Sequence, residues 1–150
     1  MTELLLLCTI AGQPAALPAL RVLSVVEVTE ITPIPGTPPY VVGLMALRSQ
    51  ALTVIDCAVA IGVATAERPQ NPRAAVVEVD GHRYALLLDG TQDVCEPQSE
   101  PTPVAGGFGA NWRRVARGLV ETGREPAVLL DIDKLLARPA IDPTQTPVAA

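Results

Sequence analysis

The side chains that most often carry chemistry are few in this chain and far apart. His82 is the single histidine and lies in a polar turn, where an imidazole is usually solvated rather than catalytic. Cys8, Cys57 and Cys95 are an odd number, lack the paired spacing of a metal or redox motif, and lie in apolar segments. These residues supply no set of nucleophile, base or metal ligands. We therefore predict a protein that is not an enzyme, with no metal site and no cofactor.

A pair of carboxylates near the end of the chain is the one alternative to this interpretation. Asp131 and Asp133 would project from the same face if a strand continued through both, as in a paired acid–base site. An aspartate that ends a strand and caps the following helical turn is a more ordinary arrangement. We favour the capping role.

The overall composition indicates a folded domain rather than a nucleic-acid-binding or membrane protein. The chain has 150 residues, of which 49% are hydrophobic and 18% charged, and its formal net charge is −5. Binding to a phosphate backbone needs a basic stripe instead. The apolar run at residues 4–10 is too short to span a bilayer, so we interpret it as a buried first strand and not as a signal peptide. We expect a cytoplasmic protein with no nucleic-acid partner and no direct membrane insertion.

The elements that would position any functional residue are short apolar segments separated by turns, which is the pattern of short strands. Strands are expected at residues 4–10, 22–31, 41–47, 51–57, 74–79, 83–88, 91–95, 112–122 (one strand or a pair) and 127–132. Tight turns at residues 48–50 and at Asp80-Gly81 would close hairpins. Single helical turns are expected at residues 58–61, closed by Gly62, and at residues 133–137.

Prolines mark the connector and the tail of this predicted domain. Their density at residues 31–40 excludes both a helix and a central strand, so this segment is predicted to be an extended connector. Residues 139–150 are rich in Pro and Thr and are predicted to be a disordered tail. Short strands without a long amphipathic helix predict an all-β fold, closed as a barrel or packed as a sandwich. Periodicity alone goes no further than one compact all-β unit.

One stretch, PPYVVGLMALRSQALTVIDCAVAIG at residues 38–62, is more specific. It combines a proline and an aromatic residue, a Val-x-Gly step, a strand ending in Leu-Arg, and a strand ending in Val-Ile-Asp. The residues concerned are Pro39, Tyr40, Val41, Gly43, Leu47, Arg48, Val54, Ile55 and Asp56. Their order resembles the signature of the CheW-like domain family. VVEVTEITPIP before it, and YALLLDGTQDV and PAVLLDIDKLL after it, resemble further motifs of that family, so the resemblance covers about residues 3–137.

Two positions depart from the family pattern. Ser49 stands where the family usually has a glycine, and Thr53 stands where it usually has a proline before Val-Ile-Asp. A glycine in such a turn supplies a positive φ, which serine adopts only at a cost. We therefore expect the tip of the hairpin at residues 48–50 to differ in shape from that of the family.

The resemblance implies both a fold and a function. The fold would be two small five-stranded SH3-like barrels that share one core, with short helical turns, over residues 1–138. The function would be that of a non-catalytic adaptor that couples chemoreceptors to a CheA-type histidine kinase in bacterial chemotaxis. One surface would bind the regulatory domain of the kinase, and a groove between the barrels would take the cytoplasmic tip of a chemoreceptor.

The resemblance also implies which residues contact partners. Glu27 and Arg48 would form an ion pair that shapes the surface. Val25 and Val42 alternate with core positions, so they would present apolar surface. The full set of candidate partner-binding residues is Val25, Glu27, Tyr40, Val42, Gly43, Arg48, Leu87 and Asp89, the last two representing the second barrel.

Two other functions fit the same residues. One is a small sensory domain that binds a metabolite in a pocket between the barrels, because a fold does not by itself determine function. The other is a diverged CheW-like adaptor that serves a motility system other than flagellar chemotaxis, for which Ser49 and Thr53 leave room.

Overall fold

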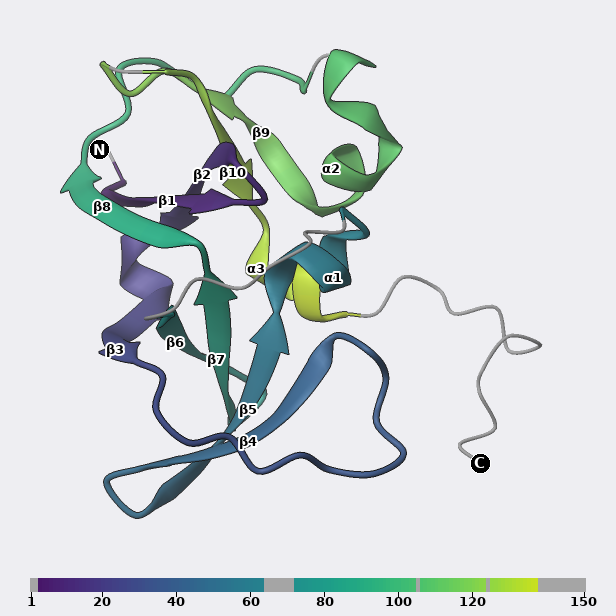
Figure 1. The fold of residues 1–150 in the computed structure, drawn as a ribbon. Coiled ribbons are helices and arrows are strands. Elements are labelled where there is room, and N and C mark those ends of the chain that lie inside the picture. The colour runs from purple at the N-terminus through teal and green to yellow at the C-terminus, as the bar shows by residue number, and fades with distance from the viewer. Residues whose placement is uncertain (1–2, 64–71, 105, 124, 138–150) are drawn as a thin grey trace.

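A computed structural model describes residues 3–63, 72–104, 106–123 and 125–137, which form two five-stranded sheets (Figure 1). Sheet A has the strand order β8-β1-β2-β10-β9, and sheet B has the order β3-β6-β7-β5-β4. The strands are β1 (Leu5–Ile10), β2 (Gln13–Pro18), β3 (Val22–Glu27), β4 (Val41–Leu47), β5 (Gln50–Asp56), β6 (Arg73–Val79), β7 (His82–Leu88), β8 (Gly90–Cys95), β9 (Ala116–Val120) and β10 (Ala127–Leu130). The helices are η1 (Ala19–Arg21), α1 (Cys57–Ile61), η2 (Gly106–Phe108), α2 (Gly109–Val115) and α3 (Ile132–Leu136). The predicted all-β class, with two five-stranded units and short helical turns, is confirmed.

The two sheets repeat one connectivity. In each sheet a hairpin lies at the centre (β1–β2 or β6–β7), and a strand that leads into a helix pairs parallel to the second strand of that hairpin. The helices α1 and α3 are capped in the same way, since Asp56 accepts a hydrogen bond from the Val59 amide and Asp131 accepts one from the Lys134 amide. Sheet B is continuous along the chain, whereas sheet A combines β1 and β2 with β8, β9 and β10.

The central strands are buried on both faces, whereas the outer strands β3 and β8 are partly exposed. This explains why β1, β10 and the second half of β7 are apolar without alternation. Leu6, Leu86 and Leu88 belong to a central core between the sheets. Leu7 and Leu87, which alternate with them, lie in the separate cores of sheet A and sheet B. The helices α1, α2 and α3 pack against one another and close the central core on the side away from β3 and β8 (Figure 1).

The strand β2 was not predicted. Pro14 and Pro18 favour a turn or an edge position, yet β2 lies between β1 and β10 in sheet A. The parallel pairing with β10 involves only Ala15 and Ala16. The two prolines flank this stretch, so neither has to donate a hydrogen bond to β10.

The prediction of one or two strands at residues 112–122 is wrong in its first part. Residues 109–115 form α2, in which Trp112 and Val115 are buried and Arg113 and Arg114 are on other faces. The spacing of three between the buried residues is helical, but seven residues are too few for this period to stand out from a strand. The strand β3 also ends earlier than predicted, at Glu27 instead of residue 31.

The edges of the sheets are treated differently. The outer edge of β4 is covered by a bridge from Thr32 to Leu44, and that of β9 by a bridge from Thr102 to Leu119. Within the described residues, no further strand pairs with the outer edges of β3 and β8. None of the described helices is long and apolar enough to cross a membrane. The predicted tail, residues 139–150, lies outside the described residues.

Candidate functional site

The outer strand β3 carries the first two candidate residues. Leu23 is an extra residue in the pairing of β3 with β6, because Val22 lies opposite Val77 and Ser24 lies opposite Val76. Such a bulge turns side chains out of the regular alternation. Leu23 is accordingly 53% exposed, and Val25, which pairs in regular register with Ala75, is 37% exposed on the outer strand of the sheet. β3 is therefore an apolar edge strand.

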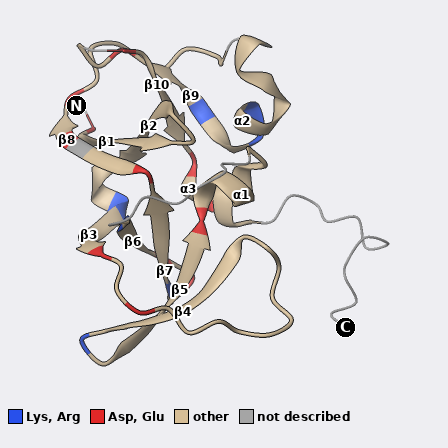
Figure 2. Cartoon of the chain, viewed as in Figure 1, with Lys and Arg blue, Asp and Glu red and all other residues tan. Residues whose placement is uncertain are grey.

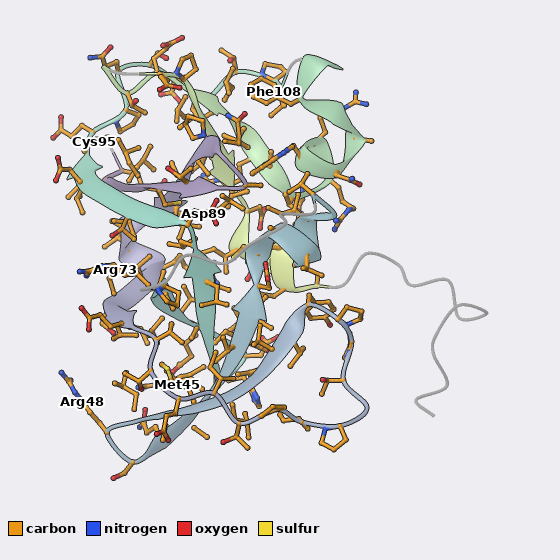
Figure 3. All side chains as sticks on the ribbon, viewed as in Figure 1. Met45, Arg48, Arg73, Asp89, Cys95 and Phe108 are labelled. Atoms are coloured by element: carbon orange, nitrogen blue, oxygen red, sulfur yellow. The ribbon has the colours of Figure 1, made fainter. Side chains whose placement is uncertain are left out.

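Glu27 at the end of β3 does not pair with Arg48. Its partner among the described residues is Arg73, directly opposite on β6, with 3.8 Å between Oε1 and Nη2. Both side chains are more than half exposed, so this ion pair contributes little to stability. Figure 3 shows Arg73 beside β3 and Arg48 pointing away from the sheet. The pairing of Glu27 with Arg48, which the resemblance implied, is therefore absent from the described structure.

Arg48 stands at the tip of the β4–β5 hairpin. Arg48 and Ser49 both have positive φ, 51° and 68°, as the two central residues of a tight hairpin turn require. Ser49 therefore has the left-handed conformation that a glycine would adopt at this position, and serine adopts it at some cost in free energy. The hairpin tip presents an exposed cation, shown as an isolated blue segment in Figure 2.

Gly43 and Val42 have structural positions on β4. A Cβ atom at Gly43 would lie 2.3 Å from the Thr32 carbonyl oxygen, so the proline-rich connector crosses β4 where no side chain stands in its way. Val42 is the extra residue of a bulge beside Gly43 and packs partly against the core of sheet B. Gly43 is buried, and its side of β4 is covered by the chain itself.

Tyr40 lies away from Val25. Its carbonyl oxygen accepts a hydrogen bond of 2.8 Å from the Asp56 amide at the start of α1, and its side chain packs partly against the central core. β3 and β4 are the two opposite edges of sheet B. The structure thus places Val25 and Glu27 on one edge strand and Tyr40, Val42, Gly43 and Arg48 along the other.

The two candidates from the second half of the chain do not form a shared surface. Leu87 is only 8% exposed and belongs to the core of sheet B. Asp89 is exposed and lies where the chain passes from β7 to β8: its amide donates to the Thr9 carbonyl at 2.9 Å, and its Oδ2 accepts from the Gly12 amide at 3.3 Å. Asp89 therefore ties the β1–β2 hairpin to this crossing.

Cys8 and Cys57 are buried in the central core, whereas Cys95 is half-buried beside the core of sheet A. Burial raises the pKa of Cys8 to about 12, and the nearby Asp89 carboxylate adds to this effect. Burial also raises the pKa of Cys57 well above its ordinary value. Because the thiolate is the reactive form, neither thiol is prepared for nucleophilic chemistry.

The carboxylate pair near the C-terminus is divided between two structural tasks. Asp131 caps α3, as the sequence predicted, and Asp133 forms an ion pair with Arg21, with 3.0 Å between Oδ1 and Nη2. His82 contacts the ring of Tyr84 at a centroid distance of 5.3 Å. Within the described residues, no three His, Cys, Asp or Glu side chains are grouped to hold a metal ion.

Val25 and Val94 point toward the space between the sheets. Val25 lies opposite Ala75 in sheet B, and Val94 lies opposite Leu6 in sheet A. Directly opposed residues share a face, and both Ala75 and Leu6 belong to the central core. The two valines therefore extend the central core outward, each from an outer strand.

Three further exposed apolar residues lie on segments next to these strands: Leu23 on β3, Leu20 in η1, which leads into β3, and Leu4 directly before β1. Leu4 accepts a hydrogen bond from the Ala19 amide at 2.9 Å, which places it beside Leu20, and Leu20 is 88% exposed. We call the set "the apolar edge"; its members are Leu4, Leu20, Leu23, Val25 and Val94. In Figure 1, β3 and β8, which carry Leu23, Val25 and Val94, lie on the side of the molecule opposite α1, α2 and α3. Exposed apolar patches of this kind commonly mark interaction sites.

A family model, the CheW-like domain, matches residues 4–140 of the chain. The chain belongs to the CheW-like domain family. The chemotaxis protein CheW of Rhizobium meliloti (strain 1021) is 29% identical over 107 residues, which cover 69% of this chain and 67% of that protein. The scaffolding protein TtCheW of Thermoanaerobacter tengcongensis has the same fold, with a TM-score of 0.75 at 22% identity over 90% of this chain and 88% of that one.

Most of the apolar edge of this CheW-like chain was missed from the sequence. Val25 was predicted from its alternation with core positions, but the structure places it opposite Ala75, on the face of the central core. Val94, opposite Leu6, was not predicted. Leu4 cannot be distinguished by sequence from the other residues of its apolar run. Leu20 lies in a helix that is too short to show a periodic pattern, so its exposure could not be predicted. Only the pairing of the strands brings these distant segments to one side of the molecule.

Proposed function

We propose that this CheW-like protein is a non-catalytic cytoplasmic adaptor that couples chemoreceptors to a CheA-type histidine kinase. The observation that carries the proposal is the apolar edge, because it leaves apolar side chains of both sheets exposed at the open side of a shared core. A catalytic protein would need a positioned set of titratable groups. The described thiols and carboxylates instead serve packing, capping and ion pairing.

The apolar edge suits the cytoplasmic tip of a chemoreceptor, which the family resemblance presents as a helical hairpin. An amphipathic helix can lay its apolar face along exposed apolar side chains. Val25 from sheet B and Val94 from sheet A would contact it together, so the helix would bind only when both sheets are in place. The side chains of the apolar edge are held by the strands of a rigid scaffold, which limits the entropy lost when the helix binds.

The β4–β5 hairpin suits the regulatory domain of the kinase. Arg48 is exposed at its tip, and an exposed cation at an interface rim favours association with an acidic partner surface. The apolar edge and Arg48 belong to different strands, so one molecule can hold receptor and kinase at the same time. The adaptor then transmits receptor state by geometry, since it fixes the kinase relative to the receptor.

Binding experiments with matched variants test this assignment. Val94→Asp should weaken binding of a receptor cytoplasmic fragment by about tenfold or more, the usual size for the loss of a central apolar contact, and leave kinase binding unchanged. Arg48→Glu should do the reverse. If both variants bound both partners as the wild type does, the proposed surfaces would be wrong. Receptors and kinases from a chemotaxis system and from another motility system can be compared in the same assay.

A further inference from the structure

The tip of the β4–β5 hairpin extends beyond the ladder that anchors β5. β5 begins at Gln50, but its parallel pairing with β7 begins only with Thr53 opposite Tyr84. Gln50 and the two residues after it pair with β4 alone. β4 is an outer strand, and the Thr32 bridge meets it only at Leu44. Among the described residues, no backbone outside the hairpin pairs with residues 45–52.

The side chain of Arg83 links β7 to the part of β5 that has no backbone pairing with it. Arg83 on β7 donates from Nη1 to the Oε1 atom of Gln50, the residue directly after the turn that holds Arg48 and Ser49. The Nε atom of the same guanidinium donates to Oε1 of Glu78 at 3.3 Å. Glu78 lies directly opposite Arg83 in the β6–β7 hairpin. The guanidinium therefore has one anchor in the body of the sheet and one on the hairpin.

Arginine fits this task because its planar fork of donors can bind two acceptors in a fixed geometry. The Arg83 and Glu78 side chains are 41% and 47% exposed, so the ion pair alone adds little to the stability of the fold. The effect that we expect from Arg83 is instead a restriction of the motion of the hairpin tip. Without Arg83, the turn is held to β7 only from Thr53 onward, and the tip gains freedom that binding must then remove.

We propose that Arg83 is a positioning residue, which through Gln50 orients the β4–β5 hairpin so that Arg48 meets the regulatory domain of the kinase. This inference rests on the proposed function, because it concerns the same surface. Arg83 makes no contact of its own with the kinase in this scheme. It acts before binding, by reducing the number of orientations that Arg48 samples.

Calorimetric titration of the kinase regulatory domain into variants of the full chain tests the inference. Arg83→Ala and Gln50→Ala should each weaken binding by about three- to tenfold, and the double variant should be no weaker than either, because both break one contact. Gln50→Glu should bind as the wild type does, since its carboxylate accepts the same hydrogen bond. Arg113→Ala, which removes an exposed arginine from α2, is the matched control and should change nothing.

The outcomes separate this inference from the function on which it rests. If Arg83→Ala and Gln50→Ala bind normally, or if their effects add, while Arg48→Glu abolishes binding, the positioning role is wrong and the adaptor function stands. If the folded wild type does not bind the domain, both are wrong. Gln50 is exposed, so Gln50→Ala gives a result even where Arg83→Ala reduces folding.

Discussion

An added methyl group at position 43 would meet the backbone of Thr32 as well as the side chain of Ile31, whose Cγ2 would lie 2.8 Å away. Its Cβ would lie 2.3 Å from the Thr32 carbonyl oxygen and 2.8 Å from the Thr32 carbonyl carbon. The connector is fixed there by two hydrogen bonds, Thr32 N to Leu44 O at 2.8 Å and Leu44 N to Thr32 O at 2.9 Å. Relief of the clash would break this bridge and uncover the outer edge of β4.

Gly43→Ala should therefore lower the free energy of unfolding by about 1–3 kcal/mol, the range for overpacking and backbone strain. Urea denaturation followed by circular dichroism measures this change. Gly90→Ala is the control, because a Cβ at Gly90 meets no atom within 4 Å. Equal stability of the two variants would show that the connector does not approach β4 as described.

The buried thiols give the protein a defined response to alkaline pH. The pKa of Cys8 is raised from 9.0 to about 12 in the folded state, so above pH 9 the unfolded chain releases a proton that the folded chain retains. The contribution of Cys8 to stability is complete below that pH and falls as the pH rises toward 12, by roughly 1 kcal/mol per pH unit. Stability of Cys8→Ala, measured by denaturation between pH 8 and 11 (roughly the window set by the unfolded and folded values), should fall less steeply. Identical slopes for both proteins would exclude this role of Cys8.

At the scale of the elements, side chains of α2 join the two halves of the chain. Arg114 donates from Nη2 to the carbonyls of Ala60 and Ile61 at 3.0 and 2.9 Å, and Asn111 donates to the Gly62 carbonyl at 3.2 Å. These are carbonyls at the end of α1, which have no acceptor role within the helix. α1 follows a strand of sheet B and α2 precedes a strand of sheet A, so the contact links the sheets beside the central core.

Arg114→Ala should destabilise the fold by about 1.5–3 kcal/mol, as expected for hydrogen bonds from a charged group to partly buried acceptors. Thermal unfolding measures the loss, and Arg113→Ala is again the matched control because its side chain is exposed on the same helix. Receptor and kinase binding of the folded variant should be unchanged at low temperature. A Tm equal to that of the control would contradict the linking role.

Short-range chemistry explains which elements could be predicted. The turn at Asp80-Gly81, the cap at Gly62 and the strand pair β4–β5 depend on residues next to one another in the chain, and the sequence predicts all of them. β2 and α2 depend on what packs beside them: β10 pairs between the prolines of β2, and Trp112 and Val115 of α2 are buried against the central core. No local pattern contains that information.

At the scale of the whole molecule, the candidate site is the least local feature. The β-branched residues of β3 indicate a strand that includes Val25. Val94, which we propose contacts the same partner, lies on a strand of the other sheet. The family resemblance supplied Arg48 and Glu27 but not the actual ion pair of Glu27 with Arg73. Leu87 was predicted to face a partner and is buried, because both faces of the central strand β7 are covered.

The strands of sheet B lie between β2 and β8 in the sequence, so the chain passes from sheet A to sheet B and back. The sheets share one central core, which α1, α2 and α3 close on one side. A receptor on the apolar edge and a kinase on the β4–β5 hairpin would thus contact one rigid body. The proposed coupling role depends on this rigidity, since a signal passed by geometry needs a fixed distance between its two contacts.

The most direct test of the adaptor function is co-sedimentation of a CheA-type kinase with receptor-containing membranes, with and without this protein. The proposed function predicts that the kinase sediments with the membranes when the wild-type protein is present and stays in the supernatant when it is replaced by Val94→Asp or Arg48→Glu. A kinase that stays in the supernatant in the presence of the folded wild-type protein, or that sediments equally well with both variants, would contradict it.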